Sequence, residues 1–394
     1  MIAKRGILSL PDEILFRIID ILREGCEEEY GRERVDKLID QLSRTSRRFR
    51  NMAMSSVTLW TKITNDCLCR KRFAYHIAHT KNAPLRIVFH AASYSDWEGE
   101  LALILPYKDR WYSFVGVFVM HTEDVARRFP NMVFPRLEIA SFCLIAGDSN
   151  DKFFSTWGFP KLKELTLVGT IPAADHFIDI VSLNISMMDV YEDHAVIQRI
   201  LKFLSRLHRL ENLTMDLTEL PRYHVDTTRL EKVKLPAVKN LSVCNSTQGA
   251  VVGERCSATV TGQLFSMLEV PNANNVRLSL QFDYFEFIAI WAMMFYEMGA
   301  AKCLETVTSL SIVVPNAENP RKLEFFLKQF TNVENLELDG KYLIPALLVM
   351  PTPVNLKRLR SLVLKIRRGN LPRGWKDHLY QLTPNVDRLD VTVK

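Results

Sequence analysis

The sequence predicts an α/β protein in which a small N-terminal helical domain precedes a long solenoid with a parallel, concave sheet. Apolar residues recur at helical spacing near the N-terminus, and a short strand-like motif repeats through the remaining chain. The composition is that of a globular protein, because 47% of the 394 residues are hydrophobic. We expect a helical domain over residues 8–64, a helical connector over 65–84 and one solenoid over 85–394.

The first helix is predicted to begin at Leu10-Pro11. Proline suits the first turn, where its missing N–H would have no partner, and Asp12 and Glu13 lie at the positive end of the helix dipole. The apolar residues that follow at helical spacing are Ile14, Leu15, Ile18, Ile19 and Leu22. One short helix cannot bury an apolar face of this size by itself, so the face needs a partner surface.

A charged segment, residues 23–36, separates this helix from a second helical stretch at 38–42. Ser-Arg-Thr-Ser-Arg-Arg-Phe-Arg follows at 43–50, and Leu59-Trp60 comes about ten residues later. These motifs, in this order, resemble an F-box of the kind common in mushroom-forming fungi, and residues 78–87 resemble the segment after it. Two features depart from that pattern: Phe49 stands where the family usually has Trp, and the charged segment is longer and more acidic.

The F-box resemblance implies docking on the linker protein Skp1 and, through it, on a cullin–RING ubiquitin ligase. The residues expected to contact Skp1 are Leu10, Pro11, Ile14, Leu15, Ile18 and Leu22. Those expected to organise the helices behind them are Leu42, Phe49 and Trp60. A plain helical cap on the solenoid is the alternative interpretation of the same segment.

A motif of the form Leu-x-x-Leu-x-Leu recurs through the rest of the chain, for example at 162–167, 210–215, 333–338 and 359–364. Its central leucines are Leu137, Leu165, Leu183, Leu213, Leu241, Leu278, Leu310, Leu336, Leu362 and Leu389. Most intervals are 26–30 residues, with irregular ones of 18, 37 and 32. The motif and its period resemble the leucine-rich repeats, whose units stack into a solenoid with a parallel concave sheet.

Between the predicted strands, helical segments such as 194–207 and 321–330 would supply the outer layer. The most apolar segment, Tyr284–Met298, is expected to be a buried helix of that layer, with a partner-docking surface as the alternative.

Polar residues alternate with the leucines along these strands and are expected to line the open face of the sheet. The candidate substrate-binding residues are Glu164, Thr166, Asn212, Thr214, Asn240, Ser242, Ser309, Ser311, Asn335, Glu337, Ser361 and Arg388. Their mixed charge suits a protein ligand. The balance of 51 basic against 45 acidic residues does not indicate a nucleic-acid-binding surface.

The sequence contains no phosphate-binding glycine loop, no His-Glu-x-x-His and no nucleophile elbow, so we expect no enzyme activity, cofactor or metal. Cys67, Cys69, His76 and His79 are zinc-ligand types, but Cys-x-Cys is a cramped spacing for one ion, and a packed helix is the favoured interpretation. A hydrolase with dispersed catalytic residues is a remote third alternative.

The N-terminus has no apolar signal-peptide core, the seven cysteines are scattered, and no stretch is long enough to span a bilayer. We therefore expect a cytoplasmic or nuclear protein with reduced thiols and no membrane partner. The basic run 70–72 is interpreted as a solvent-exposed face. A weak contact with an acidic partner and a nuclear-localisation signal are the alternatives.

Together these patterns predict a non-catalytic adaptor whose F-box docks on Skp1 and whose solenoid binds a substrate protein. The alternative is a repeat scaffold for protein–protein interaction without coupling to a ligase. The sequence leaves open whether a substrate would be recognised through a phosphate, a short peptide or a folded surface.

Overall fold

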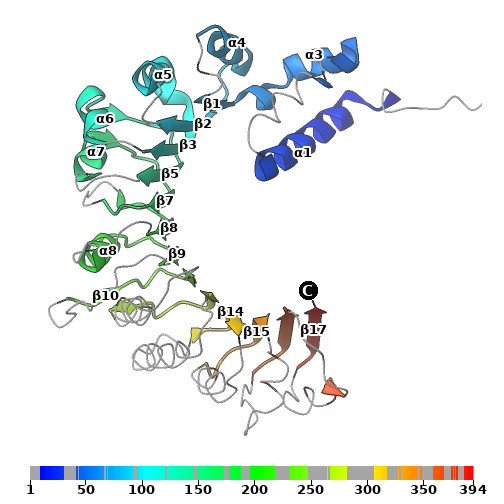
Figure 1. Cartoon of the computed structure of the whole chain (residues 1–394), viewed down its shortest axis with the longest axis vertical. Coiled ribbons are helices and arrows are strands. Elements are labelled where there is room, and N and C mark those ends of the chain that lie inside the picture. The colour runs from blue at the N-terminus through cyan, green and yellow to red at the C-terminus, as the bar shows by residue number, and fades with distance from the viewer. Residues whose placement is uncertain are drawn as a thin grey trace, which may run out of the picture. The chain divides into compact units, whose positions relative to one another are not determined.

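The structure is a computed structural model in which helices and parallel strands follow one another along the chain (Figure 1). It describes residues 9–30, 41–42, 44–65, 68, 70–91, 96–119, 122–144, 150–172, 177–187, 196–217, 230–246, 264, 267–281, 306–316, 327, 330–341, 343, 347, 358–367, 374–375, 377, 379 and 386–393. No helix in these ranges is both long enough and apolar enough to cross a lipid bilayer.

The main sheet contains 13 strands, and their order in the sheet is their order along the chain. Its strands are β1 (Lys62–Thr64), β2 (Leu85–Ala91), β3 (Trp111–Phe118), β5 (Ile139–Leu144), β7 (Glu164–Val168), β8 (Ser182–Ser186), β9 (Asn212–Asp216), β11 (Asn240–Ser246), β13 (Asn275–Gln281), β14 (Ser309–Asn316), β15 (Asn335–Lys341), β16 (Ser361–Ile366) and β17 (Arg388–Val393). Every pair with a described register is parallel. The predicted α/β class with a parallel sheet is confirmed.

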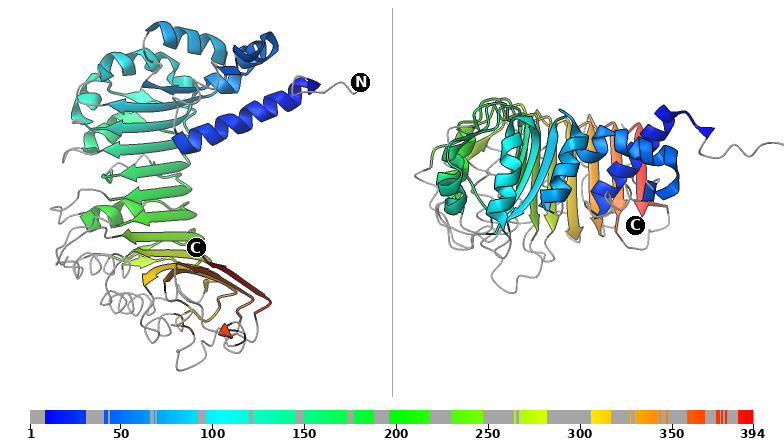
Figure 2. Two further views of the ribbon diagram at one scale, coloured as in Figure 1. Left: turned by 45° about the vertical axis from the view of Figure 1, so that its right-hand side comes forward. Right: turned by 90° about the horizontal axis from the view of Figure 1, so that it is seen from above.

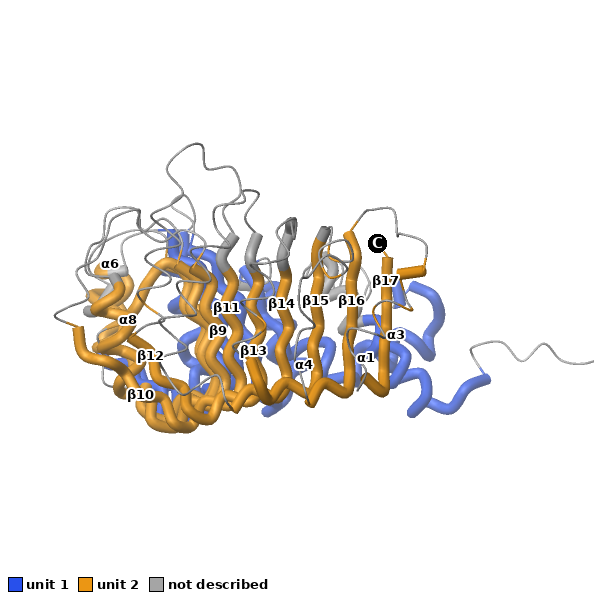
Figure 3. The backbone as a smooth tube through the Cα atoms, turned by 90° about the horizontal axis from the view of Figure 1, so that it is seen from below, with its two compact units in different colours: residues 1–120, 131–140, 158–161 blue, residues 121–130, 141–157, 162–394 orange. Residues whose placement is uncertain are grey.

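The chain divides into two compact units (Figure 3). Unit 1 comprises residues 1–120, 131–140 and 158–161, and unit 2 comprises 121–130, 141–157 and 162–394. The helical elements of unit 1 are α1 (Asp12–Tyr30), α3 (Arg47–Ser55), η2 (Val57–Trp60), α4 (Arg70–Thr80), α5 (Trp97–Ile104) and η4 (Leu105–Arg110). Those of unit 2 are α6 (Thr122–Arg128), α7 (Asn150–Thr156) and α8 (Val196–Leu204).

Two short strand pairs accompany the main sheet. One joins β10 (Val233–Lys234) to β12 (Leu268–Glu269), and the other joins β4 (Met132–Val133) to β6 (Trp157–Gly158).

The strands of unit 2 stack so that equivalent leucines form a ladder. Parallel register aligns Leu213, Leu241, Val276, Leu310, Leu336 and Leu362, each at most 4% exposed. Because alternate side chains point to opposite faces of a strand, this ladder and the parallel ladder two residues on make one continuous core. Figure 3 shows the strands side by side.

A strand of the main sheet lies at each of the ten predicted repeats, although two central leucines were misplaced: Leu137 lies before β5, and Leu278 lies two residues out of register. Leu278 pairs with Val243 and Ile312, so the residue equivalent to Leu241 is Val276. Both Val276 and Leu278 point inward, because residues two apart in a strand share a face. The motif alone therefore does not tell which of the two is the central residue. The corrected intervals on either side of Val276 are 35 and 34 residues.

The helices α6, α7 and α8 lie on one side of the strands of unit 2 (Figures 1 and 2). The predicted helix at 194–207 is confirmed as α8, which buries Ile197, Ile200, Leu201 and Leu204. The segment Tyr284–Met298 lies outside the described residues, as does all of 321–330 except Leu327 and Phe330.

The N-terminal elements differ from the predicted boundaries in two places. The sheet begins at β1, within the segment assigned to the helical domain, because Ile63 is buried and pairs with Ile87 of β2. The first helix also continues to Tyr30, whereas the sequence had suggested a break at Arg23. A three-residue strand and a charged helical turn both leave a weak periodic signal.

Candidate functional site

The N-terminal helices pack around a small hydrophobic cluster, which we call the N-terminal core. Its buried members are Leu15, Ile19, Phe49, Met52, Ala53, Leu59 and Trp60. They come from α1, α3 and η2, so the cluster exists only when all three elements meet. Of the residues predicted to organise the helices, Phe49 and Trp60 belong to the core, and the partly buried Leu42 packs against it.

Polar contacts hold the backbone of Phe49 and the side chain of Trp60 in the core. The Ser46 hydroxyl accepts a hydrogen bond from the Phe49 N–H at 3.2 Å, which caps α3. The Trp60 indole donates to the Ala53 carbonyl at 3.0 Å, so this buried polar group is paired. The ring of Trp60 also meets Tyr75 of α4 edge-on at 5.5 Å between centroids.

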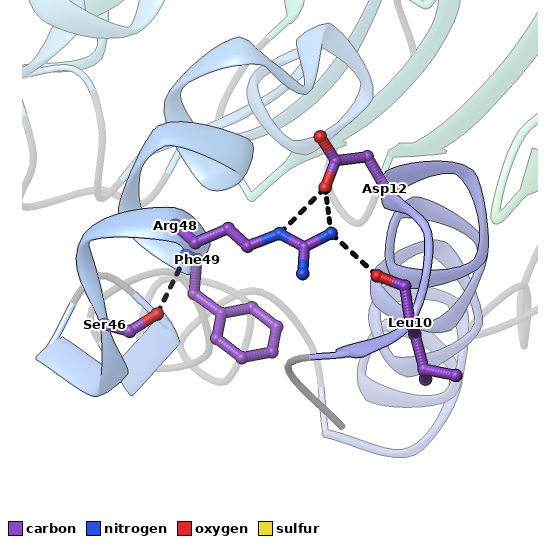
Figure 4. Close-up of polar contacts among 5 residues, drawn as sticks. All are labelled: Leu10, Asp12, Ser46, Arg48 and Phe49. Atoms are coloured by element: carbon purple, nitrogen blue, oxygen red, sulfur yellow. Dashed lines mark hydrogen bonds and ion pairs between the residues drawn. The ribbon is translucent and has the colours of Figure 1, made fainter. Parts of the chain in front are cut away.

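Arg48 joins the start of α1 to α3 (Figure 4). Its guanidinium donates to the Leu10 carbonyl at 2.7 Å and, through Nε, to the Asp12 carboxylate at 2.9 Å. Further along α1, the Thr58 hydroxyl donates to the Asp20 carboxylate at 2.9 Å and ties η2 to α1. These two contacts set the rotation of α1, and hence which of its residues face the core.

The face of α1 next to the N-terminal core carries exposed and half-buried apolar residues, which we call the apolar stripe: Pro11, Ile14, Ile18, Ile21 and Leu22. Ile14 is 49% exposed, Ile21 54% and Leu22 46%, while Pro11 is exposed and Ile18 half-buried. Spacings of three, four and seven residues place them along one face of the helix. The stripe borders Leu15 and Ile19, so α1 is apolar over a wider arc than its own core covers.

The residues predicted to contact Skp1 fall into three groups. Pro11, Ile14 and Leu22 are exposed, and Leu10 and Ile18 are partly buried beside the N-terminal core. Leu15 is 1% exposed and packs inside that core, so we count it as a structural residue and not as a surface contact. Ile21 was missed, although its seven-residue spacing from Ile14 is a signal that the sequence contains.

In unit 2, the twelve predicted substrate-binding residues all lie on the face opposite the buried leucines, which we call the open face. All twelve are half-buried or exposed. The register aligns them in rows across the sheet, and the first row runs through Glu164, Ser182, Asn212, Asn240, Asn275, Ser309, Asn335, Ser361 and Arg388. Within this row the Asn240 amide donates to the Asn212 amide oxygen at 2.6 Å.

Charged residues at the C-terminal end of the open face pair with one another. Lys365 Nζ lies 2.6 Å from the Glu337 carboxylate, and Arg367 Nε lies 2.7 Å from that of Asp339. The hydrogen bond that Arg367 donates to Asp339 raises the pKa of Arg367. Arg388 donates to Asp390 at 2.7 Å. This end of the face is therefore rich in charge but locally neutral.

Near the middle of the open face, Cys244 lies in the row between Asp216 and Ser279. Burial raises the pKa of its thiol, and the negative charge of Asp216 raises it further. The Ser279 hydroxyl and Arg277 lower this pKa in part. Cys244 and Arg277 were not among the residues singled out from the sequence.

The described residues contain no group of three or more His, Cys, Asp and Glu side chains that could hold a metal ion. Of the four zinc-ligand types considered above, Cys67 and Cys69 lie outside the described residues. His76 is 4% exposed, and the ring of His79 hydrogen-bonds the Tyr75 carbonyl at 2.8 Å. Both histidines pack their rings against Trp60.

Comparison of the chain with known protein families and with curated proteins finds no match.

Proposed function

We propose that the chain is the substrate-recognition adaptor of a Skp1–cullin–F-box ubiquitin ligase. In this proposal α1, α3 and η2 form an F-box that docks on Skp1, and the strands and helices that follow are leucine-rich repeats. The chain carries out no chemistry itself. It holds a substrate protein near the ubiquitin-charged enzyme, which converts a bimolecular encounter into a local one.

The apolar stripe on α1 is the observation that carries this proposal. Three of the eight large hydrophobic residues exposed in the described ranges, Ile14, Ile21 and Leu22, lie on this one helix. A contiguous apolar surface of this kind marks a protein-interaction site more often than it marks chance exposure. The Leu-Pro start of α1 and the Arg-Arg-aromatic run of α3 then favour Skp1 as the partner.

The open face of unit 2 is the proposed substrate surface. Its rows of amide, hydroxyl and charged groups offer hydrogen-bonding partners at the spacing of adjacent strands, about 4.8 Å. A surface that mixes both charges with neutral polar groups suits a protein partner. A repeat scaffold without ligase coupling would use the same face, so only the linker contact separates the two functions.

Affinity purification from native cells tests the proposal. The wild-type chain should recover Skp1 and a cullin, and Ile14→Asp combined with Leu22→Asp should lose both. Both positions are exposed, so the double substitution leaves the N-terminal core intact. Ile178→Asp is the matched control, because Ile178 is an equally exposed isoleucine of unit 2 and should leave recovery of Skp1 unchanged. Recovery of other proteins without Skp1 from wild type would favour the scaffold.

A further inference from the structure

Positive charge is concentrated in one segment of unit 1. Residues 41–95 contain ten arginines and lysines and a single acidic residue, Asp66, whereas the rest of the chain contains 41 basic and 44 acidic residues. The net charge of +6 for the whole chain averages over these two parts and therefore hides the difference between them. Positive charge segregated to this extent indicates a surface for an anionic partner.

The helices α3 and α4 bring part of this charge together. The hydroxyl of Tyr75 on α4 donates to Sδ of Met54 on α3 at 3.1 Å, so the two helices meet at these side chains. Exposed cations lie one or two turns from this contact along each helix, at spacings of three, four and seven residues that place them on the same faces. We call this surface the basic face, and its members are Arg47, Arg50, Met54, Lys71, Arg72 and Tyr75.

The acidic residues described around these helices lie elsewhere. The described parts of 41–95 include no acidic residue, since Asp66 lies outside them. From α1, the carboxylates of Asp12 and Asp20 bond Arg48 and Thr58, neither of which belongs to the basic face. The charge of the basic face is therefore of one sign, unlike the paired charges at the C-terminal end of the open face.

Tyr75 places an exposed aromatic ring among these cations. Its side chain is 46% exposed. The ring of His79 lies 4.4 Å from it between centroids, Trp60 meets it edge-on, and its hydroxyl bonds Met54. These three contacts hold the ring in one orientation. A fixed, exposed ring beside cations offers a stacking surface for a flat, anionic partner.

The same observations favour one class of anionic partner over two others. An anionic membrane would require several exposed apolar side chains next to the cations, but Tyr75 is the only exposed large hydrophobic residue in the described parts of 41–95. An acidic protein would satisfy the guanidinium groups but has no particular use for the exposed ring. A nucleic acid uses both, because its phosphates bind arginine and lysine and its bases stack on aromatic rings.

We propose that the basic face binds single-stranded nucleic acid, with backbone phosphates on its four cations and a base stacked on Tyr75. A rise of 1.5 Å per residue puts those cations about 5–10 Å from the Tyr75–Met54 contact along the helices, near the phosphates on either side of a stacked base. A single strand fits better than a duplex, whose bases stack on one another and show only their edges. This inference does not rest on the proposed adaptor function, because the basic face includes no residue of the apolar stripe.

The test uses the full chain and a fluorescein-labelled oligouridylate of about 20 nucleotides, with binding followed by fluorescence anisotropy between about 50 and 200 mM salt. For wild type, the logarithm of the binding constant should fall against the logarithm of the salt concentration with a slope of about −3, as about four phosphate contacts require. Arg47→Gln combined with Lys71→Gln removes two of these contacts. It should reduce the slope to about −1.5 and weaken binding by about tenfold or more at the lower salt concentration.

Two further variants separate stacking from charge. Tyr75→Ala should weaken binding by about tenfold with the salt dependence unchanged, and Tyr75→Phe, which keeps the ring, should bind as wild type does. Arg358→Gln combined with Lys234→Gln is the matched control, because it removes one exposed arginine and one exposed lysine from unit 2. This control should bind the oligonucleotide as wild type does. Unchanged melting temperatures exclude loss of fold as the cause of a defect.

Several results would overturn the proposal. They are no saturable binding of the oligonucleotide by wild type, equal weakening by the control variant, and equal affinity for a duplex of the same length. An equal affinity for an oligoglutamate of the same charge would assign the basic face to an acidic protein instead. Binding to vesicles of phosphatidylcholine and phosphatidylserine without binding to the oligonucleotide would assign it to a membrane.

Discussion

At the scale of single residues, Arg48 determines how the first helix begins. Replacing it with alanine removes the hydrogen bonds to the Leu10 carbonyl and the Asp12 carboxylate. Because both side chains are more than one-third exposed, we expect a loss of only about 1 kcal/mol. That loss should speed amide hydrogen exchange at Leu15, whose N–H donates to the Pro11 carbonyl, about fivefold.

Arg47→Ala is the control for this measurement, because Arg47 is the exposed neighbour on the same turn of α3. It should leave exchange in α1 at the wild-type rate. Equal acceleration by both substitutions would mean that net charge, and not the Arg48 contacts, stabilises the start of the helix.

Cys244 gives a pH-dependent prediction at the same scale. Burial and Asp216 raise the pKa of its thiol, so at any pH below that pKa less of it is thiolate than in a free cysteine. The pH at which its alkylation rate rises should therefore be higher than that of an unfolded cysteine. Asp216→Asn should shift the profile to lower pH and Arg277→Gln to higher pH, because these charges act in opposite directions.

Iodoacetamide labelling followed by peptide mass analysis measures this profile for Cys244 separately from the other cysteines. A profile that Arg277→Gln does not move would show that the guanidinium lies away from Cys244 and would contradict this assignment of charges.

At the scale of elements, each strand of unit 2 is stabilised by its inward-facing residues and tolerates substitution of its outward-facing ones. Leu213 of β9 is 1% exposed, whereas Thr214 beside it is half-buried on the open face. We expect Leu213→Ala to destabilise unit 2 by about 2–5 kcal/mol, and Thr214→Ala by less than about 1 kcal/mol. Urea unfolding followed by circular dichroism compares them, and equal costs would contradict the assignment of faces.

The strands that repeat the leucine motif could be predicted because a period of two, repeated through the chain, is a strong signal. The strand β3 carries no such motif and escaped detection, because its buried positions hold Trp111, Phe114, Gly116 and Phe118 and no leucine. On α1 the apolar residues could be predicted, but their division between core and surface could not. That division depends on contacts made by Arg48 and Thr58, both more than 35 residues away from their partners.

At the open face, the alternation predicted which residues would be polar and outward, and the register then added what the sequence could not. Arg277 belongs to an irregular unit whose motif was displaced by two residues, and Ser242 and Ser311 lie 35 and 34 residues away from it. Only the pairing of strands brings these three side chains into one row.

At the scale of the whole molecule, each compact unit carries its own candidate surface. Unit 1 presents the apolar stripe of α1, and unit 2 presents the open polar face. An adaptor needs two surfaces of different chemistry, one apolar for a constant linker and one polar for a varied partner. The central claim is that the apolar stripe is the linker surface.

Titration of purified Skp1 into the full chain tests that claim most directly. We expect saturable one-to-one binding by wild type, a loss of about a hundredfold or more in affinity for Ile14→Asp with Leu22→Asp, and wild-type affinity for Ile178→Asp. Failure of the wild-type chain to bind Skp1, or equal binding by the Ile14/Leu22 double variant, would contradict the account.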